Sequence, residues 1–181
     1  MNVVVIYESV YGNTRAIAEA IAEGLGGADV VPVHEASEAS ELDRTELLVV
    51  GGPTHVHGLA TKRSRQMAVE ALHEDGGAQV EPGALEEPGL RPWLRDLPRA
   101  DRARAAAFDT RLEKSPWLTG AASRGIAKRM RASGYDVIAT ESFLVEDSEG
   151  PLEEGELDRA RRWGVELARS LHAAVGQRGQ Q

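Results

Sequence analysis

The 181-residue chain contains no cysteine. This absence excludes disulfide bonds, thiol redox chemistry, iron–sulfur clusters and zinc sites with cysteine ligands. Long apolar runs are lacking as well: the longest is the five residues Val3–Tyr7, whereas a membrane-spanning helix needs about 20. The N-terminus shows no basic segment followed by an apolar one, which is the pattern of a secretory signal. The sequence therefore predicts a soluble, cytoplasmic protein with no membrane partner.

Aromatic residues are scarce, at 4% of the chain, but the overall composition is that of a globular protein. Hydrophobic residues make up 41% and charged residues 28%. A domain holds about 100–200 residues, so the length predicts one domain. We expect this domain to span residues 1–174 and to be followed by a disordered tail at residues 175–181, where Gln and Gly predominate.

Basic residues are too scattered to predict a surface that binds nucleic acid. Lys and Arg total 21 against 29 Asp and Glu, which gives a formal net charge of −8. The middle of the chain, residues 61–134, carries 14 basic and 10 acidic side chains, but the two signs alternate. Proteins that bind a nucleic-acid duplex present a dominant basic stripe. We therefore expect no nucleic-acid partner.

Five short apolar runs predict strands, at residues 3–7, 30–33, 47–50, 105–108 and 137–145. Unbroken apolar runs are typical of parallel strands that are buried on both faces. Pro32 has no N–H group to donate to a central ladder, so the second strand is expected at an edge of the sheet. The fold class predicted is α/β, an open, doubly wound parallel sheet with helices on both faces.

Helical spacing of apolar residues separates these strands. We expect helices after Thr14, over residues 61–72 with Met67 and Ala68 facing inward, from Leu118 to Met130, and from Leu157 to Leu171. Residues 73–89 are rich in Gly, Pro and Glu and have no periodicity. They predict a mobile loop that folding does not require, because the free energy of loop closure varies slowly with length.

The segment after the first strand, residues 8–14, has the composition of a phosphate-binding loop. It reads Glu-Ser-Val-Tyr-Gly-Asn-Thr and leads directly into a helix. The free N–H groups and positive dipole end of a helix favour an anion, and the hydroxyl groups of Ser9 and Thr14 add donors. The alternative is that Ser9, Asn13 or Thr14 simply caps the helix.

The wider pattern resembles the flavodoxin family. Val5-Ile6-Tyr7-x-Ser9-x-x-Gly12-x-Thr14-x-x-x-Ala18-x-x-Ile21 is similar to the flavodoxin signature at every fixed position, and residues 51–58 resemble the Gly-x-Pro-Thr segment of flavodoxins and related quinone reductases. The resemblance covers about residues 1–172. It implies a three-layer flavodoxin-like fold of five strands in the order 2-1-3-4-5 and FMN as cofactor.

The resemblance also implies a set of residues that bind FMN. The first loop would hold the phosphate, and two later loops would flank the isoalloxazine ring. The phosphate residues are Ser9, Val10, Tyr11, Gly12, Asn13 and Thr14. The ring residues are Pro53, Thr54, His55, Val56, His57 and Gly58 on one side, and Asp109, Thr110, Arg111 and Trp117 on the other.

Two departures from the family pattern bear on this site. Tyr11 stands where many flavodoxins have Thr, which removes one hydroxyl contact to the phosphate. Because aromatic residues are few, the planar side chains expected over the ring are Trp117 or one of His55 and His57. His55 and His57 could also suggest a metal, but no carboxylate lies beside them at ligand spacing, so we expect none.

We expect an FMN-binding redox protein, either an electron carrier or a small flavin-dependent reductase. The flavin would supply the chemistry, so no catalytic side chain is assigned. The implied partners are a redox protein, NAD(P)H or a quinone. The alternative is a flavin-free binding or regulatory domain that keeps the fold, because fold alone does not fix function.

Overall fold

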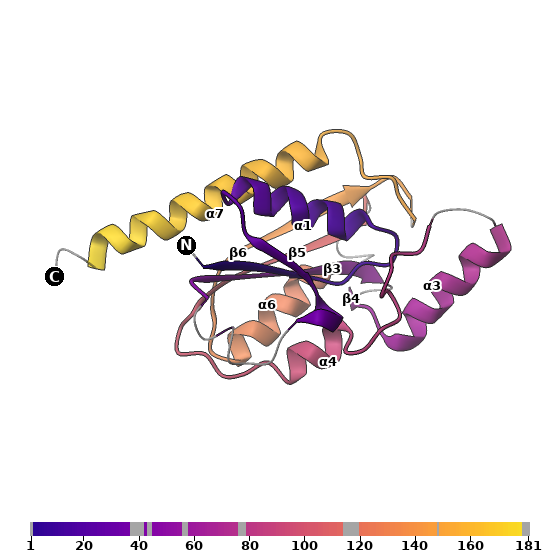
Figure 1. Ribbon diagram of the computed structural model, residues 1–181, viewed down its shortest axis with the longest axis horizontal. Coiled ribbons are helices and arrows are strands. Elements are labelled where there is room, and N and C mark those ends of the chain that lie inside the picture. Colours follow the sequence, from indigo (N-terminus) through magenta and orange to yellow (C-terminus); the bar gives the residue numbers. More distant parts are fainter. Residues whose placement is uncertain are drawn as a thin grey trace.

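A computed structural model describes residues 2–36, 42, 45–55, 58–75, 79–113, 120–147 and 149–178. Its centre is a parallel sheet in the order β2-β1-β3-β5-β6 (Figure 1). The strands are β1 (Val3–Tyr7), β2 (Asp29–Pro32), β3 (Leu47–His55), β5 (Arg104–Leu112) and β6 (Asp136–Val145). A short strand, β4 (Gly58–Leu59), pairs antiparallel with the end of β3. The predicted fold class, the strand order and the edge position of the Pro32 strand are thus confirmed.

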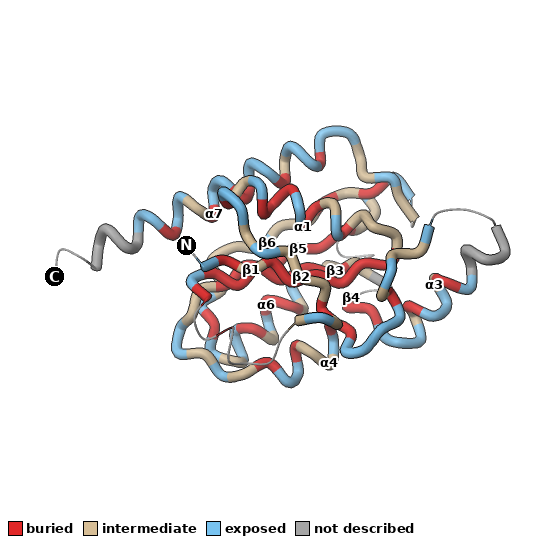
Figure 2. The backbone as a smooth tube through the Cα atoms, in the orientation of Figure 1, coloured by how far each residue is buried: buried red, intermediate tan, exposed pale blue. Residues whose placement is uncertain are grey.

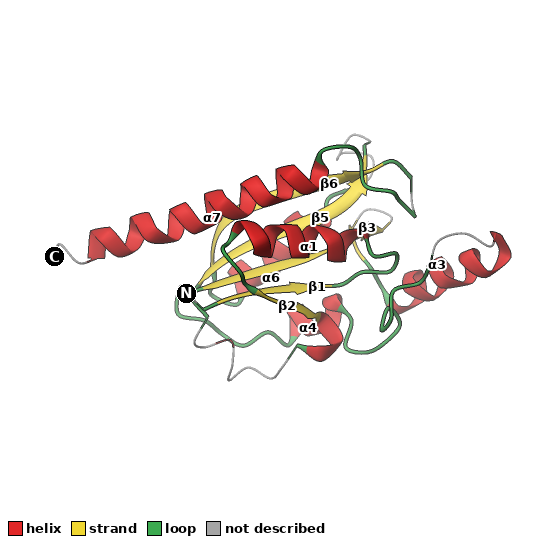
Figure 3. Cartoon of the chain, turned by 45° about the horizontal axis from the view of Figure 1, so that its top comes forward, coloured by secondary structure: helices red, strands yellow, loops and turns green. Residues whose placement is uncertain are grey.

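Helices cover both faces of the sheet. Helices α1 (Asn13–Gly24) and α7 (Glu156–Arg178) lie on one face, and α4 (Leu90–Arg95) and α6 (Ala122–Ala132) lie on the other (Figures 1 and 3). A 3-10 turn, η1 (Val33–Glu35), follows β2. Helix α3 (Lys62–Asp75) stands apart from both layers. None of the helices in the described part of the chain combines the length and apolarity that a membrane span requires.

The core has two halves, one on each face of the sheet, and Figure 2 shows the strands as its most buried part. On the α1–α7 face, the rings of Phe108, Phe143 and Trp163 meet edge to face, with centroids 6.1–6.5 Å apart. On the opposite face, Leu48 and Ile126 are buried among the side chains of α4 and α6. Burial on both faces explains why these strands are continuous apolar runs in the sequence.

Several predicted boundaries are corrected by the structure. Residues 51–55 and 109–112, predicted in loops, are the ends of strands β3 and β5, because they continue the pairing with neighbouring strands. Val33 opens η1 and is not part of β2. Helix α3 includes residues 73–75, which were predicted as loop, because the first helix-breaking glycines come only at positions 76 and 77. Helix α7 includes residues 175–178, which were predicted as tail, because one glycine at 176 costs a helix only about 1 kcal/mol. Residues 76–78 and 179–181 lie outside the described part.

The short helix α4 was not predicted, although it fills much of the second core. Leu90 and Leu94 are fully buried, four residues apart on one face of the helix. The spacing of these two leucines was not recognised in the sequence, because a proline stands between them and because Arg91 and Arg95 indicated a solvated surface. Proline is tolerated here because it lies in the first turn, where its missing N–H group has no helical partner.

Candidate functional site

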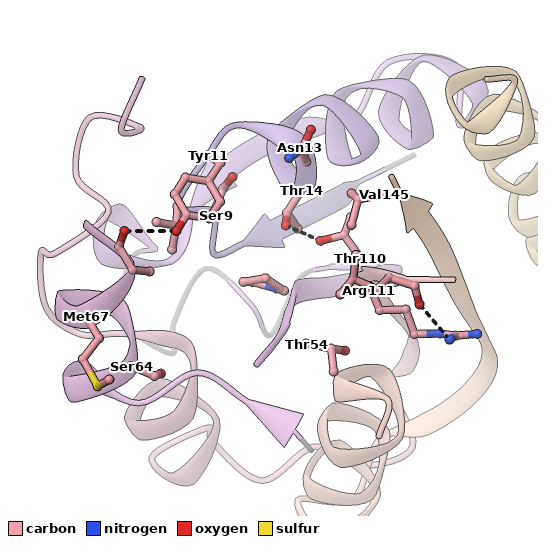
Figure 4. A pocket seen from close by; sticks show the side chains of 14 residues that line it. Ser9, Tyr11, Asn13, Thr14, Thr54, Ser64, Met67, Thr110, Arg111 and Val145 are labelled. Carbon is pink, nitrogen blue, oxygen red and sulfur yellow. Dashed lines mark hydrogen bonds between the residues drawn. The ribbon is translucent and has the colours of Figure 1, made fainter. Parts of the chain in front are cut away.

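A cavity of about 450 Å³ opens where the carboxyl ends of β1, β3, β5 and β6 meet helix α3 (Figure 4). Ligands of doubly wound sheets bind outside the carboxyl ends of the strands, and this volume is within the ordinary range for a small-molecule site. The residues lining the cavity are Ser9, Val10, Tyr11, Asn13, Thr14, Pro53, Thr54, Ser64, Met67, Ala68, Thr110, Arg111, Leu112 and Val145.

The loop after β1 turns sharply into helix α1 at Gly12. Gly12 is the N-cap of α1 and has a φ of +84°, a left-handed conformation that glycine adopts without strain. Its N–H group donates to Oγ of Ser9 over 3.0 Å, which closes the turn. A side chain at position 12 would also crowd the Glu81 carboxylate, 3.2 Å from where a Cβ would lie. Glycine is therefore required at this turn.

None of the three side chains that could cap helix α1 does so. The Ser9 hydroxyl accepts the N–H group of Gly12, and the Asn13 amide donates to the carbonyl of Glu149 over 2.9 Å. The hydroxyl of Thr14 pairs with that of Thr110 over 2.8 Å. The N-cap position itself is glycine, and no side chain of the described residues caps the first turn of α1. Within this part of the chain, the N–H groups of that turn are available to an anion.

Hydrogen bonds and an ion pair connect the outer side of the same loop to residues that are distant in the sequence. The hydroxyl of Tyr11 donates to the carbonyl of Ala68 on α3 over 3.1 Å (Figure 4). The N–H group of Glu81 donates to the carbonyl of Val10 over 2.8 Å. The Glu81 carboxylate pairs with the Arg15 guanidinium over 2.9 Å, which offsets its charge beside the loop. Tyr11 thus connects the loop to α3.

On the opposite side of the cavity, Thr54 and Asp109 hold the start of helix α6. The Thr54 hydroxyl donates to Oδ2 of Asp109 over 2.7 Å and accepts the N–H group of Ala122 over 2.9 Å. The N–H group of Ser123 donates to the same Asp109 oxygen over 3.2 Å. Asp109 is fully buried and does not line the cavity. Its contacts position Thr54, which does.

Replacing Thr54 by Val should destabilise the fold. The change removes the hydroxyl but keeps the side-chain shape. It leaves the N–H group of Ala122 without its partner, and it leaves Oδ2 of the buried Asp109 with only the N–H group of Ser123. A buried polar group that loses its partner costs about 1–3 kcal/mol. The free energy of unfolding of Thr54→Val, measured in urea, should fall by about that amount.

A matched control is Thr140→Val, the same change at an exposed position of β6. It should leave the free energy of unfolding within about 0.5 kcal/mol of the parent. Equal stability of the two variants would contradict the role given to Thr54.

A buried ion pair lies directly beside the first loop. Glu8 precedes Ser9, and its Oε2 atom accepts from Nη1 of Arg65 over 2.6 Å and from the N–H group of Leu90 over 2.8 Å. The side chains of Arg65 and Glu8 are only 3% and 4% exposed. Arg65 also donates to Glu87 over 2.8 Å. Burial raises the pKa of Glu8 above its ordinary value, although the hydrogen bonds from Leu90 and Arg65 oppose that shift. This cluster anchors α3 to the end of β1.

The structure brings most of the predicted site residues together. Nine of them line the cavity: Ser9, Val10, Tyr11, Asn13, Thr14, Pro53, Thr54, Thr110 and Arg111. Gly12 forms the turn behind the cavity, Gly58 pairs with His55 in the β3–β4 hairpin, and Asp109 lies beneath Thr54. Val56, His57, Trp117 and the side chain of His55 lie outside the described residues. No group of three His, Asp or Glu side chains within the described part could hold a metal ion.

The sequence did not predict the contribution of helix α3. Ser64, Met67 and Ala68 line the cavity, so the expectation that Met67 and Ala68 face the core is wrong. Arg65 and Val69 are buried instead, and Met67 is 59% exposed. The misleading signal was Arg65, because a charged residue was not expected on the buried face of a helix. Leu112 and Val145, the ends of β5 and β6, complete the cavity wall.

The cavity therefore combines a polar end with an apolar remainder. Hydroxyl groups and the N-terminus of α1 form the polar end, which favours an anionic group. Pro53, Met67, Leu112 and Val145 supply apolar surface. This arrangement suits a small molecule that joins an anion to an apolar body.

Comparison with known proteins agrees with this geometry. The sequence model of the flavodoxin family matches residues 5–134. No curated protein is similar enough in sequence to count as a match. Among solved structures, the chain is similar to a flavodoxin from the domain Archaea, with 21% identity and a TM-score of 0.59, covering 95% of this chain and 99% of the other.

Two bacterial flavodoxins are similar to the same degree. Flavodoxin 1 from Bacillus cereus is 16% identical with a TM-score of 0.60, covering 93% of this chain and 98% of the other. The flavodoxin of Streptococcus pneumoniae TIGR4 is 14% identical with a TM-score of 0.62, covering 94% and 99%. At sequence identities this low, the structural similarity establishes a shared fold alone.

Proposed function

Because the chain belongs to the flavodoxin family, we propose that it binds FMN and acts as a redox protein, either an electron carrier or a small flavin-dependent reductase. One observation carries this proposal. The uncapped N-terminus of α1 opens into a cavity of about 450 Å³ at the carboxyl ends of the central strands. That is where a doubly wound fold binds its ligand.

The donors at the polar end fit a phosphate. The first N–H groups of α1 and the hydroxyl groups of Ser9 and Thr14 would donate to its oxygens, and the left-handed turn at Gly12 brings the backbone close. These donors are neutral, so the positive end of the helix dipole would supply most of the electrostatic attraction. Glu81, the acidic side chain beside the turn, is paired with Arg15.

The apolar part of the cavity fits a flat ring system. Pro53 and Thr54 come from β3, while Thr110 and Arg111 come from β5. These two strands are paired, so a ring lying across their carboxyl ends would contact both. Asp109 and the start of α6 hold Thr54 in place. Bound FMN would supply one- and two-electron transfer, and the chain would supply its orientation, its exclusion from water and the surrounding charge.

Reduction of the FMN-loaded protein tests this function. In a stepwise anaerobic titration, the midpoint potential of FMN should differ from that of free FMN, because the site binds its oxidised and reduced forms unequally. A potential equal to that of free FMN would contradict the proposal. Oxidation of NADH or NADPH by the loaded protein alone would identify a reductase, and electron transfer only to a second redox protein would identify a carrier.

A further inference from the structure

Helix α3 presents two different faces to the rest of the protein. Arg65 and Val69, four residues apart, are buried on one face. Ser64, Met67 and Ala68, at spacings of three and four, line the cavity on the neighbouring face (Figure 4). The helix is thus a wall of the cavity and not a peripheral appendage.

Two sets of contacts fix this wall beside the first loop. The guanidinium of Arg65 joins the carboxylates of Glu8 and Glu87. Three residues further along the helix, the carbonyl of Ala68 accepts the hydroxyl of Tyr11. Because Met67 lies between these two anchors in the sequence, its backbone is held at the edge of the cavity.

The Met67 side chain has the chemistry to cover a flat ring. It is 59% exposed although it is large and apolar, and it lines the cavity. Tyr11 supplies the one aromatic ring among the described residues of this lining, and its hydroxyl is engaged by α3. Methionine is flexible and polarisable, and its sulfur makes favourable contacts with aromatic rings.

We propose that Met67 packs against the isoalloxazine ring of the flavin, with α3 as one wall of the flavin site. The inference rests on the proposed function, since it assigns a ring contact within that site. Met67 contacts the ring and not the phosphate, so its effect on affinity is the same for FMN and for riboflavin. This distinguishes it from the hydroxyl groups of the first loop.

Affinity measurements on matched variants test the assignment. Met67→Ala should weaken the binding of FMN and of riboflavin alike, by about two- to tenfold, the range for a sulfur–aromatic contact. Gln66→Ala, at the exposed preceding position of α3, should leave both affinities unchanged. Both variants should unfold at the same urea concentration as the parent, because both side chains are exposed.

Oxidation by dilute peroxide gives an independent readout, since Met130 is fully buried and serves as an internal reference. Peptide mapping by mass spectrometry should find that saturating FMN slows sulfoxide formation at Met67 at least threefold and leaves Met130 unchanged. Bound FMN, seen by fluorescence quenching, without protection of Met67 would overturn this assignment alone. An absence of quenching would overturn the proposed function and this inference together.

Discussion

Replacing Arg65 by Met should destabilise the protein by about 3–5 kcal/mol at pH 8, the largest loss that we expect from a single change. Arg65 is 3% exposed and forms a salt bridge with Glu8, which is 4% exposed. Methionine fills similar space but leaves the Glu8 carboxylate buried without a counter-charge. Oε1 of Glu8 already has no hydrogen-bond partner among the described residues, so little else can compensate.

The loss should depend on pH in a defined direction. Burial raises the pKa of Glu8 above its ordinary value of 4.5 even with Arg65 present. A carboxyl group with a raised pKa in the folded state contributes stability that is fully present below the unfolded pKa and is lost as pH rises through the folded pKa. Removing Arg65 raises that pKa further. The deficit of Arg65→Met should therefore be smaller at pH 5, where Glu8 can take up a proton, than at pH 8.

Urea unfolding at both pH values checks this prediction, with Arg63→Met as the matched control. Arg63 is exposed on the same helix, so its replacement should change the free energy of unfolding by no more than about 0.5 kcal/mol. A deficit for Arg65→Met that matches the control, or one that grows as the pH falls, would show that the buried pair does not anchor α3.

The second large effect concerns the first loop. Ser9→Ala and Thr14→Ala should each weaken FMN binding by about ten- to a hundredfold, because a hydrogen bond to a charged group contributes roughly 1.5–3 kcal/mol. Riboflavin lacks the phosphate, so its affinity should barely change. Fluorescence titration of each variant with both flavins measures the two effects directly.

A structural role for these hydroxyl groups predicts a different result. If Ser9 and Thr14 only stabilise the turn and the contact with Thr110, both flavins should lose affinity in parallel. Ser170→Ala serves as the control, because that serine is exposed on α7 and its hydroxyl donates only to the carbonyl of Glu166 in the same helix. Parallel losses for FMN and riboflavin would show that this loop does not bind the phosphate.

The parallel strands and the layers could be predicted because buried parallel strands are continuous apolar runs in a sequence. The strand order was predicted from the resemblance to flavodoxins. Each of the five parallel strands contains an apolar run, and Pro32 indicated an edge strand. The strand ends were harder to predict, since β3 and β5 continue to His55 and Leu112, beyond the point where glycines or polar residues interrupt the apolar run. Helix α4 is too short, at six residues, for its spacing to stand out.

The cavity lining was predicted where it comes from the carboxyl ends of β1, β3 and β5, because ligands of a doubly wound sheet bind there. The segment from Ser9 to Thr14 leads into helix α1, and its position at the carboxyl end of β1 follows from the fold. The part contributed by α3 was not predicted, because it depends on the contact between Arg65 and Glu8, which are 57 positions apart in the sequence. A charged residue in a helix usually indicates solvent, and only tertiary structure shows the buried partner.

The central claim is that this cavity binds FMN, and a fluorescence titration tests it most directly. Adding the purified protein to a fixed, low concentration of FMN should quench the flavin emission and shift its visible absorption, because the ring leaves water for the cavity between β3, β5 and α3. Riboflavin should bind more weakly by at least tenfold, since it cannot use the donors at the N-terminus of α1. Flavin emission and absorption that stay unchanged in excess protein would contradict the account and favour a flavin-free domain.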